Sequence, residues 1–258
     1  MRTVEKALKL LDHFDDTRPE IGLSDLARLA AIDKATVLRM LGDMAAAGLV
    51  EQDPQSRLWR LGVGLLRLAR LREARFPVTR VLTPILEKLA EDTGETSHAA
   101  LFSGHDLSNV GVVESSRSTR VHIEPGLRLP LHATASGVAF TAFARADLVT
   151  QALKRPLVGI TATTPTTRAA FAALVDAAQA RGYATADQTF EAEVYGIAMP
   201  LFGPDGFAIG ALAVASPASR VTPAHEAAIV AALGPAAQTA TQGLGGRIPP
   251  HYRIAAQE

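Results

Sequence analysis

The chain has 258 residues, of which 48% are hydrophobic, and its 26 basic side chains balance 26 acidic ones. A net charge of zero argues against a protein that is basic throughout, and the absence of cysteine excludes disulfides, thiolate nucleophiles and cysteine-bound zinc. Charges run through the first 16 residues, which therefore predict neither a signal peptide nor a membrane span. We expect a globular protein of the cytoplasm that makes no membrane contact.

The first 61 residues predict a winged helix-turn-helix. An apolar stripe in residues 4–14 predicts an opening helix. Ser24 is expected to cap a second, short helix. Asp33 is expected to cap a third helix that ends at Gly48, because glycine tolerates the left-handed conformation after a helix. The segments LVEQ and RLWRL then predict the two strands of a wing, joined through a turn at DPQS.

The helix after Asp33 has the pattern of a DNA-reading helix. Its apolar side comprises Val37, Leu41, Met44 and Ala45. The opposite side is free to enter a DNA major groove, where Thr36 and Arg39 are expected to read base edges. Lys34, Arg57 and Arg60 are expected to position phosphates. In full, the predicted DNA contacts are Ser24, Lys34, Ala35, Thr36, Arg39, Asp43, Arg57 and Arg60. Each arginine taken alone is better explained as a solvated surface residue, so the assignment depends on the set.

Residues 63–76 predict a basic helix between two domains. Leucines and arginines are interspersed along it until Pro77, which cannot continue a helix. Its arginines allow a contact with DNA beside the wing. We favour a linker helix that forms a dimer contact, with the arginines on a solvated face.

Residues 77–243 predict an α+β domain. The patterns indicate a helix at 81–90, two strands joined at SGHD and a helix at HATASGVAFTAFA. A helix at 166–182 follows, then three strands, the last two joined at GPDG, and a closing helix at 225–242. This order predicts a central antiparallel sheet with helices outside it. The tail, residues 244–258, is rich in glycine and proline and is expected to be mobile.

Several unrelated phrases occur in the chain in a fixed order. The N-terminal ones are LSDLARLA, DKATVLRMLGDMAAAGLV and DPQSRLWRLG. The later ones are TGET with His98 two residues on, GLRLPLHATASG, RGYA, PLFGPDG and ASPASRVT. Together they resemble the IclR family of bacterial transcriptional regulators, from about Val4 to about Gly243. We accordingly divide the chain into domains at 1–62, 63–76 and 77–243, and the resemblance implies that the last of these has a GAF-like fold. It also implies a homodimer or tetramer that binds double-stranded operator DNA and a small-molecule effector. We expect no cofactor.

The resemblance places the effector site between the segment 131–137 and the sheet. Because Thr134 and its successors open a helix, their amides can donate to a carboxylate, although ordinary capping explains the same residues. Ala186, Glu193, Tyr195 and Gly196 stand where Asp, Gly, Arg and Cys are common in the family, and Ala213 and Ala215 where serines are. The lost hydroxyls and the added Tyr195 favour an apolar effector such as an aromatic or branched organic acid. The predicted ligand contacts are Leu131, Thr134, Ala135, Ser136, Gly137, Asp187, Tyr195, Gly196, Ala213 and Ala215.

Two other function classes compete with a regulator. Ser136 and His132, oriented by Glu114 or Asp187, would form the nucleophile and base of an acyl-transfer or hydrolytic enzyme, but HATASG lacks the G-x-S-x-G elbow. A small-molecule-binding protein without an operator leaves the Thr36 and Arg39 face unexplained. The scattered histidines lack the spacing of metal ligands, so we expect no metal. The sequence therefore predicts a ligand-responsive, non-enzymatic regulator that binds a palindromic operator.

Overall fold

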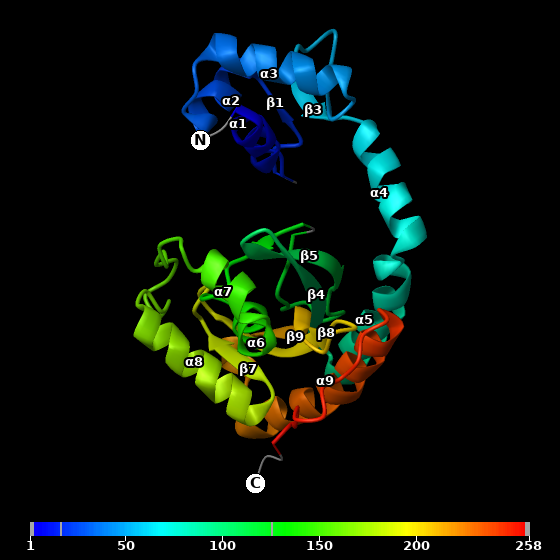
Figure 1. The fold of residues 1–258 in the computed structure, drawn as a ribbon, viewed down its shortest axis with the longest axis vertical. Helices are drawn as coiled ribbons and strands as arrows, with labels where there is room; N and C mark the ends of the chain where they lie inside the picture. Colours follow the sequence, from blue (N-terminus) through cyan, green and yellow to red (C-terminus); the bar gives the residue numbers. More distant parts are fainter. Residues whose placement is uncertain (1–2, 16, 125, 256–258) are drawn as a thin grey trace. The chain divides into compact units, whose positions relative to one another are not determined.

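The structure, a computed structural model, describes residues 3–15, 17–124 and 126–255. It divides into two compact units, residues 1–76 and 77–258 (Figure 1). Each unit has a hydrophobic core of its own. This arrangement confirms the predicted mixed fold, with a helix-turn-helix part before an α+β part. In the described part of the chain, no helix is both long and apolar enough to cross a membrane.

The first unit is a winged helix-turn-helix. Its elements are α1 (Thr3–Lys9), a 3-10 turn (Leu10–His13), β1 (Glu20–Ile21), α2 (Leu23–Ala30), α3 (Lys34–Ala46), β2 (Val50–Gln52), β3 (Trp59–Leu61) and α4 (Gly64–Arg75). The strands form an antiparallel sheet in the order β1-β3-β2. Leu26, Val37 and Trp59 meet in its core, which fixes α3 against α2 and the wing.

Helix α3 has the two ends that the sequence predicts. The Asp33 carboxylate accepts a hydrogen bond of 2.8 Å from the Thr36 amide, which satisfies one of the free donors at the start of the helix. Gly48 follows the helix with a φ of +73°, in the left-handed region. Both capping predictions for α3 are confirmed.

The prediction that Ser24 caps α2 is wrong. The helix begins at Leu23, its N-cap is Gly22, and no side chain caps it. Ser24 is therefore an exposed residue of the first turn. The physical reason is strand β1, which the sequence analysis did not predict: Ile21 pairs with Trp59 and carries the chain directly into the helix.

The second unit is a six-stranded antiparallel sheet with helices on both faces (Figure 1). Its elements are α5 (Val78–Thr93), β4 (Thr96–Ser103), β5 (Asp106–Val113), β6 (Arg128–Leu129), α6 (Ala135–Phe143), α7 (Ala146–Ala152), α8 (Arg168–Arg181), β7 (Ala184–Asp187), β8 (Val194–Phe202), β9 (Ala208–Pro217), a 3-10 turn (Ala218–Arg220) and α9 (Pro223–Gly243). The strand order is β6-β5-β4-β9-β8-β7. Helices α6 and α8 cover one face, and α5 and α9 cover the other.

Successive residues of the long strands point into two different cores. Ala198 and Ala211 pack with Phe140 of α6 on one face of the sheet. Ile197 and Leu212 pack under α5 and α9 on the other face. Side chains alternate across a strand, so the face of any residue in β7, β8 or β9 follows from its position in this register. The face under α6 is rich in alanine, which leaves room beside it.

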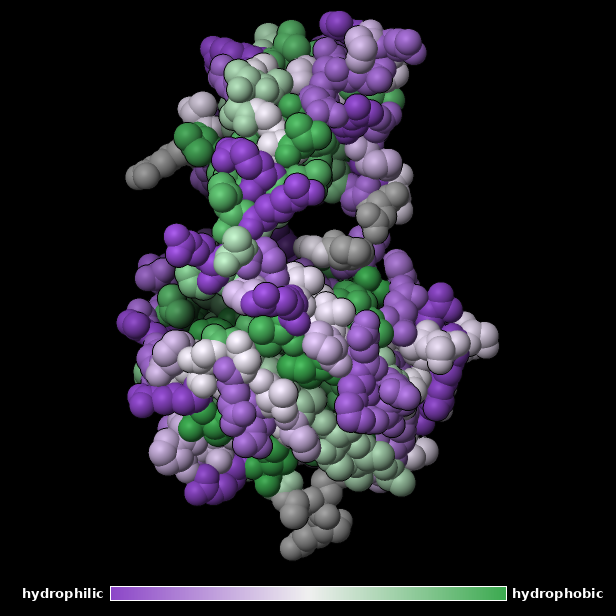
Figure 2. All heavy atoms as spheres, turned by 90° about the vertical axis from the view of Figure 1, so that its right-hand side faces the viewer, coloured by the Kyte–Doolittle hydropathy of each residue, from purple (hydrophilic) through white to green (hydrophobic). Residues whose placement is uncertain are grey.

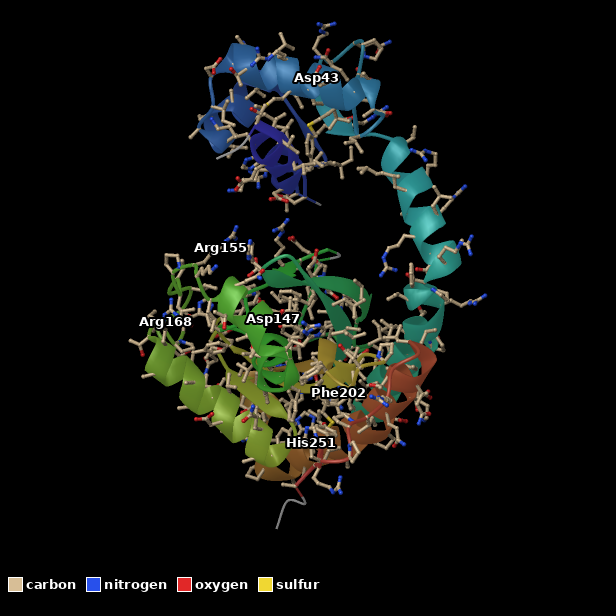
Figure 3. The ribbon with its side chains drawn as sticks, viewed as in Figure 1. Asp43, Asp147, Arg155, Arg168, Phe202 and His251 are labelled. Atoms are coloured by element: carbon tan, nitrogen blue, oxygen red, sulfur yellow. The ribbon has the colours of Figure 1, made fainter. Side chains whose placement is uncertain are left out.

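The C-terminal tail is packed, contrary to the expectation that it is mobile. The Tyr252 hydroxyl donates to the Gly182 carbonyl at 2.6 Å, and the Ala255 amide donates to the Arg181 carbonyl at 2.9 Å. The Tyr252 ring also meets the rings of Phe143 and Phe202, the second of which is labelled in Figure 3. These contacts fix residues 244–255 on the second unit, and residues 256–258 lie outside the described part of the chain. Glycine and proline in this segment shape a turn rather than a free end.

Candidate functional site

Helix α3 presents one solvent-facing side that carries most of the predicted DNA contacts. Lys34, Ala35, Arg39 and Asp43 are exposed there, and Thr36 is half-buried (Figure 3 labels Asp43). Val37, Leu41 and Met44 are buried on the opposite side, as the helical periodicity predicts. The solvent-facing side also includes Leu38, which was not predicted and which is 48% exposed. An exposed leucine on such a helix can meet a thymine methyl group.

The two arginines of the wing differ in what surrounds them. Arg60 is paired with Glu51 at 2.7 Å and with Glu20 at 3.2 Å, so its charge is already balanced by two carboxylates. These hydrogen bonds also raise the pKa of Arg60. Arg57 is exposed in the turn between β2 and β3, with a φ of +63°. Of the two, Arg57 is the better placed to meet a phosphate.

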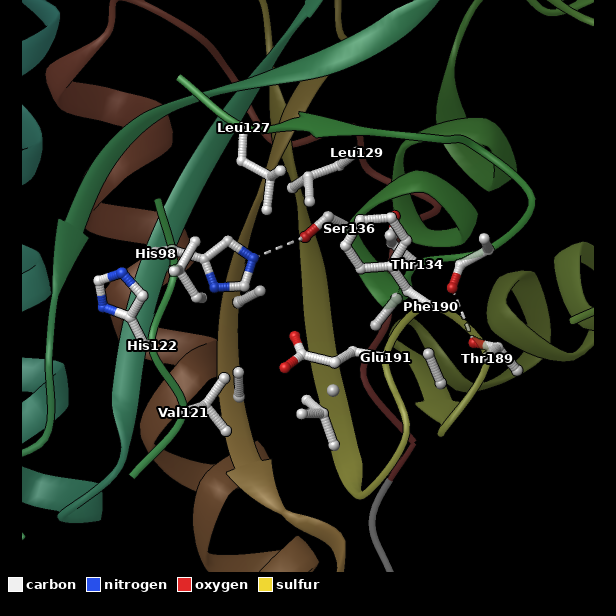
Figure 4. A pocket seen from close by; sticks show the side chains of 18 residues that line it. His98, Val121, His122, Leu127, Leu129, Thr134, Ser136, Thr189, Phe190 and Glu191 are labelled. Atoms are coloured by element: carbon white, nitrogen blue, oxygen red, sulfur yellow. Dashed lines mark hydrogen bonds between the residues drawn. The ribbon is translucent and has the colours of Figure 1, made fainter. Parts of the chain in front are cut away.

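The second unit contains a cavity between the start of α6 and the sheet (Figure 4). It holds about 550 Å³ of empty space, its opening to solvent included. Its floor is made by residues of four strands: Ala186, Gly196, Ala213, Ala215 and His98. Its walls are mainly apolar: Val121, Ile123, Leu127, Leu129, Phe190 and Val194. An apolar body of modest size fits this space.

The N-terminus of α6 forms the polar end of the cavity. Thr134 caps the helix, since its hydroxyl accepts from the Gly137 amide at 3.0 Å. The amides of Ala135 and Ser136 have no acceptor among the described residues. The Ser136 hydroxyl lies 3.3 Å from His98 Nε2 (Figure 4). Donors therefore gather here at the positive end of a helix.

His98 is the buried polar residue at the cavity floor. Its side chain is 7% exposed, and its Nδ1 atom has no hydrogen-bond partner in the described part of the chain. Burial lowers the pKa of His98 to about 4, because a charged imidazole is poorly solvated there. The ring is therefore neutral near pH 7. In the sequence, His98 was noted only as part of the TGET phrase, and the scattered histidines were considered only as metal ligands, so this position was not predicted to line the site.

Six of the ten predicted ligand contacts line the cavity, namely Thr134, Ala135, Ser136, Gly196, Ala213 and Ala215. Asp187 and Tyr195 do not; they pair with each other in the register of β7 and β8 and face the opposite side of the sheet. There the Tyr195 hydroxyl donates to Glu226 at 2.8 Å. Consecutive residues of a strand cannot share a face, so Tyr195 and Gly196 cannot both line one cavity.

Leu131 and Gly137 lie behind the cavity wall rather than in it. A Cβ atom on Gly137 would stand 2.4 Å from the Leu131 Cα atom, so glycine is needed for the turn that leads into α6. Leu131 itself is buried in the core under α6. Both residues shape the site without lining it.

Two loops that the sequence analysis did not assign complete the cavity. One is the strap, residues 114–124, which supplies Val121, His122 and Ile123. The other is the lid, residues 188–193, which supplies Thr189, Phe190 and Glu191. The lid is fastened by threonine hydroxyls: Thr164 donates to the Thr189 carbonyl, and Thr189 donates to the Ala133 carbonyl, each at 2.7 Å. Loops have no hydrophobic period, so only the threonine-rich run at 161–167 signalled this arrangement.

The geometry does not support hydrolytic chemistry at Ser136. His132, proposed as the base, instead contacts the Val158 carbonyl through Nε2 at 3.0 Å. His98 is near the hydroxyl, but no carboxylate orients its other nitrogen in the described part of the chain. Among the described residues, no cluster of three or more His, Cys, Asp or Glu side chains is arranged to hold a metal ion.

Comparisons with known proteins match both units to one family. The model of the IclR helix-turn-helix domain matches residues 3–54, and that of the bacterial transcriptional regulator IclR C-terminal domain matches residues 74–242. The chain belongs to the IclR family. IclR regulators combine a DNA-binding helix-turn-helix domain with an effector-binding domain, and this chain has both.

Named relatives of this IclR regulator are transcription factors. The regulator XynR of Escherichia coli is 29% identical over 230 residues, which cover 87% of this chain and 90% of that protein. The acetate operon repressor of Salmonella typhimurium is 27% identical over 251 residues, with 95% and 91% covered. These relatives are regulators, which confirms that the chain is not an enzyme.

Solved structures show the same fold over nearly the whole chain. An IclR regulator from Silicibacter sp. TM1040 is 43% identical, with a TM-score of 0.87 and 98% of this chain and 100% of that chain covered. An IclR homologue from Microbacterium hydrocarbonoxydans, solved with 4-hydroxybenzoate, is 24% identical, with a TM-score of 0.76 and coverage of 95% and 99%. The second likeness establishes the fold alone.

Proposed function

We propose that this IclR regulator binds a palindromic operator through α3 of two subunits and releases or tightens its hold when a small organic acid fills the cavity under α6. The observation that supports it best is the pairing of an exposed helix α3 with an apolar cavity whose polar end is a helix N-terminus. The ligand shifts operator affinity by biasing the two winged units toward one arrangement.

In the DNA complex, Arg39 and Thr36 read base edges, and Lys34 and Arg57 contact phosphates. Arg39 is exposed on α3, and its guanidinium can bind guanine through two hydrogen bonds. We leave Arg60 out of the contact set, because Glu51 and Glu20 hold it. Ala35 and Asp43 of α3 and the exposed Ser24 of α2 remain as proposed neighbours of the duplex.

The active unit is a homodimer, with a tetramer as the larger assembly, held together through α4. No residue of α4 is buried, although its sequence carries several large apolar side chains. Leu66, Leu68, Leu71 and Phe76 are between 45% and 66% exposed. Figure 2, which faces α4, shows hydrophobic side chains among hydrophilic ones. Exposed leucines on a basic helix are the composition of a subunit contact.

The effector is an acid with an apolar, aromatic or branched, body. The cavity floor carries alanine or glycine at the strand positions Ala186, Gly196, Ala213 and Ala215, so these four positions offer shape and no hydrogen bonds from side chains. The homologue solved with 4-hydroxybenzoate supports an aromatic acid as the first compound to try.

Substitution of Arg39 tests the DNA assignment. We expect Arg39→Ala to weaken binding to the operator by about 5- to 150-fold, since one bidentate guanine contact contributes about 1–3 kcal/mol of discrimination. Fluorescence anisotropy with labelled operator and with a scrambled duplex measures this. Arg155→Ala, which removes an exposed arginine from the second unit, is the matched control and should bind as the unaltered protein does. Equal operator affinity of the two variants would remove Arg39 from the interface.

A further inference from the structure

The cavity floor contains a hydrogen-bonding atom that lacks a partner. His98 Nδ1 lies in a ring that is 93% buried, and Figure 4 shows this ring at the cavity beside Ser136. Leaving such a buried atom without a partner is unfavourable. Because His98 lines the cavity, a bound molecule can supply the missing partner once the ring turns to open this atom, which is closed to solvent in the empty cavity.

The charges around the cavity favour a ligand with a single carboxylate. Among the described residues, no lysine or arginine lines the cavity, whereas the exposed carboxylate of Glu191 does. A single anion can still be held by the amides of Ala135 and Ser136 at the helix end. A second carboxylate on the ligand would face Glu191 and apolar walls, which disfavours diacids.

We propose, resting on the effector site inferred above, that His98 contacts the effector's carboxylate through Nδ1 and takes up one proton from solvent as that anion binds. Within the neutral ring, one nitrogen donates and the other accepts. Once protonated, the ring donates from both: Nε2 to the Ser136 hydroxyl at 3.3 Å, and Nδ1 to the carboxylate. His98 thereby selects acids that have one carboxylate and an apolar body.

A bound carboxylate supplies the negative partner that a protonated His98 would lack in the empty cavity. The ring is neutral when the cavity is empty, because burial lowers the pKa of His98 to about 4. An adjacent carboxylate favours the charged form and moves this pKa upward. The acid should consequently bind more tightly as the pH falls from 7 toward 5, until the acid itself becomes protonated.

Proton uptake by other titratable groups at the cavity must be distinguished from proton uptake by His98. His122 lines the cavity but pairs with Glu114 at 2.6 Å, and Glu191 lines it from the lid. The strands beside β4 place Val112 and Ala213 opposite His98, and neither titrates. His122, Glu114 and Glu191 are therefore the groups that can also exchange protons when a ligand enters.

Matched acids and amides test the proposal. Isothermal titration of the full chain at pH 6, in two buffers with different ionisation enthalpies, measures both affinity and protons taken up. The probes are benzoate, phenylacetate and cyclohexanecarboxylate, each beside its amide, with phthalate as the diacid. We expect at least one monoacid to bind with uptake of close to one proton, its amide to bind more weakly with none, and phthalate not to bind.

Three histidine variants locate the proton. His98→Gln should weaken binding of the monoacid at least about tenfold and abolish proton uptake, while amide binding persists and shows that the cavity is intact. His105→Gln, in the exposed turn of the same hairpin, is the matched control and should change neither value. Proton uptake that disappears in His122→Gln, and not in His98→Gln, would overturn the proposal.

Other outcomes of these binding measurements would also overturn the proposal. Equal binding of acid and amide, without proton uptake, would show that His98 does not recognise a carboxylate. Failure of every monoacid to bind at millimolar concentration would overturn the ligand class. Operator binding, measured on the same sample, tests the regulator assignment separately, so the two failures are distinguishable.

Discussion

A neutral imidazole at the centre of a sheet makes the second unit sensitive to acid. The pKa of His98 is lowered to about 4 from an ordinary 6.5 because burial disfavours the charged ring. The unfolded chain therefore binds more protons than the folded one as the pH falls through 6.5, and stability is lost from there down to about pH 4. Between pH 7.5 and pH 5 the loss from this residue is about 2 kcal/mol.

Substituting His98 isolates its contribution to the loss of stability at low pH. His98→Gln cannot titrate, so the second unit of the variant should lose about 2 kcal/mol less than the unaltered protein over the same pH interval. Calorimetric unfolding of both proteins at the two pH values measures the difference, and all other titrating groups are common to the pair. An equal loss in both proteins would mean that the folded His98 takes up protons as freely as the unfolded one.

Single residues also show where sequence reasoning reached the site and where it stopped. Gly196 and Ala213 were predicted on the face that lines the cavity because the order of phrases located the strands. Tyr195 and Asp187 were assigned to the wrong face, since the start of the alternation in β7 and β8 is set by pairing with β9, which no local pattern reveals. His98 was missed because its role depends on burial and on a neighbour 38 residues away.

At the scale of elements, a buried ion pair ties the strap to the rest of the second unit. Glu95, fully buried before β4, accepts two hydrogen bonds of 2.6 Å from Arg220, which follows β9. Arg220 also donates to the Thr119 carbonyl of the strap at 2.7 Å. The Thr96 hydroxyl holds the strap at the Val121 carbonyl. The strap wall of the cavity thus depends on this pair.

Removing one partner of the pair should loosen the strap. Glu95→Gln leaves the Arg220 charge poorly compensated, and because Arg220 is 24% exposed the cost should fall below the roughly 3–5 kcal/mol of a fully buried pair. We expect a lower unfolding temperature of the second unit and faster hydrogen exchange in residues 115–124. Asp92→Asn, which breaks the exposed pair with Lys88, is the control and should change neither. Unaltered exchange in the strap would show that the pair does not anchor it.

Long elements were predictable from the sequence, and short or context-dependent ones were not. Helix α3 was placed from Asp33 and Gly48 because both ends carry local signals. Strand β1 has two residues and exists only through its pairing with β3, so it has no period to detect. Helix α5 runs through Pro84, and the sequence pattern identified only its middle. The tail is ordered by Tyr252 and its aromatic partners, which lie far away in sequence.

At the scale of the whole molecule, operator binding should depend on assembly. Leu68 and Leu71 lie one turn apart on α4 and are 45% and 58% exposed. Glutamate at both positions would bury charges in the proposed subunit contact, so we expect the double variant to dissociate and its operator affinity to fall. Sedimentation velocity and anisotropy measure the two effects. A variant that stays dimeric would place the contact elsewhere.

Operator binding by the whole molecule should also depend on the salt concentration. Each phosphate neutralised by a lysine or arginine releases counterions, so the operator affinity should fall steeply as salt rises. Two copies of Lys34 and Arg57 in a dimer make this fall steeper than one copy does.

Titrating acids into the operator complex shows whether the cavity and helix α3 are coupled. DNase footprinting on the DNA upstream of the chain's own gene and neighbouring genes, with and without aliphatic and aromatic monoacids, would be carried out on the unaltered protein and on Ala213→Asp. We predict a protected palindrome whose strength changes with one acid in the unaltered protein and does not change in Ala213→Asp, which places a charge in the apolar floor. Protection that responds equally in both proteins would contradict the cavity as the sensor, and absence of protection at low salt on every fragment would contradict operator binding itself.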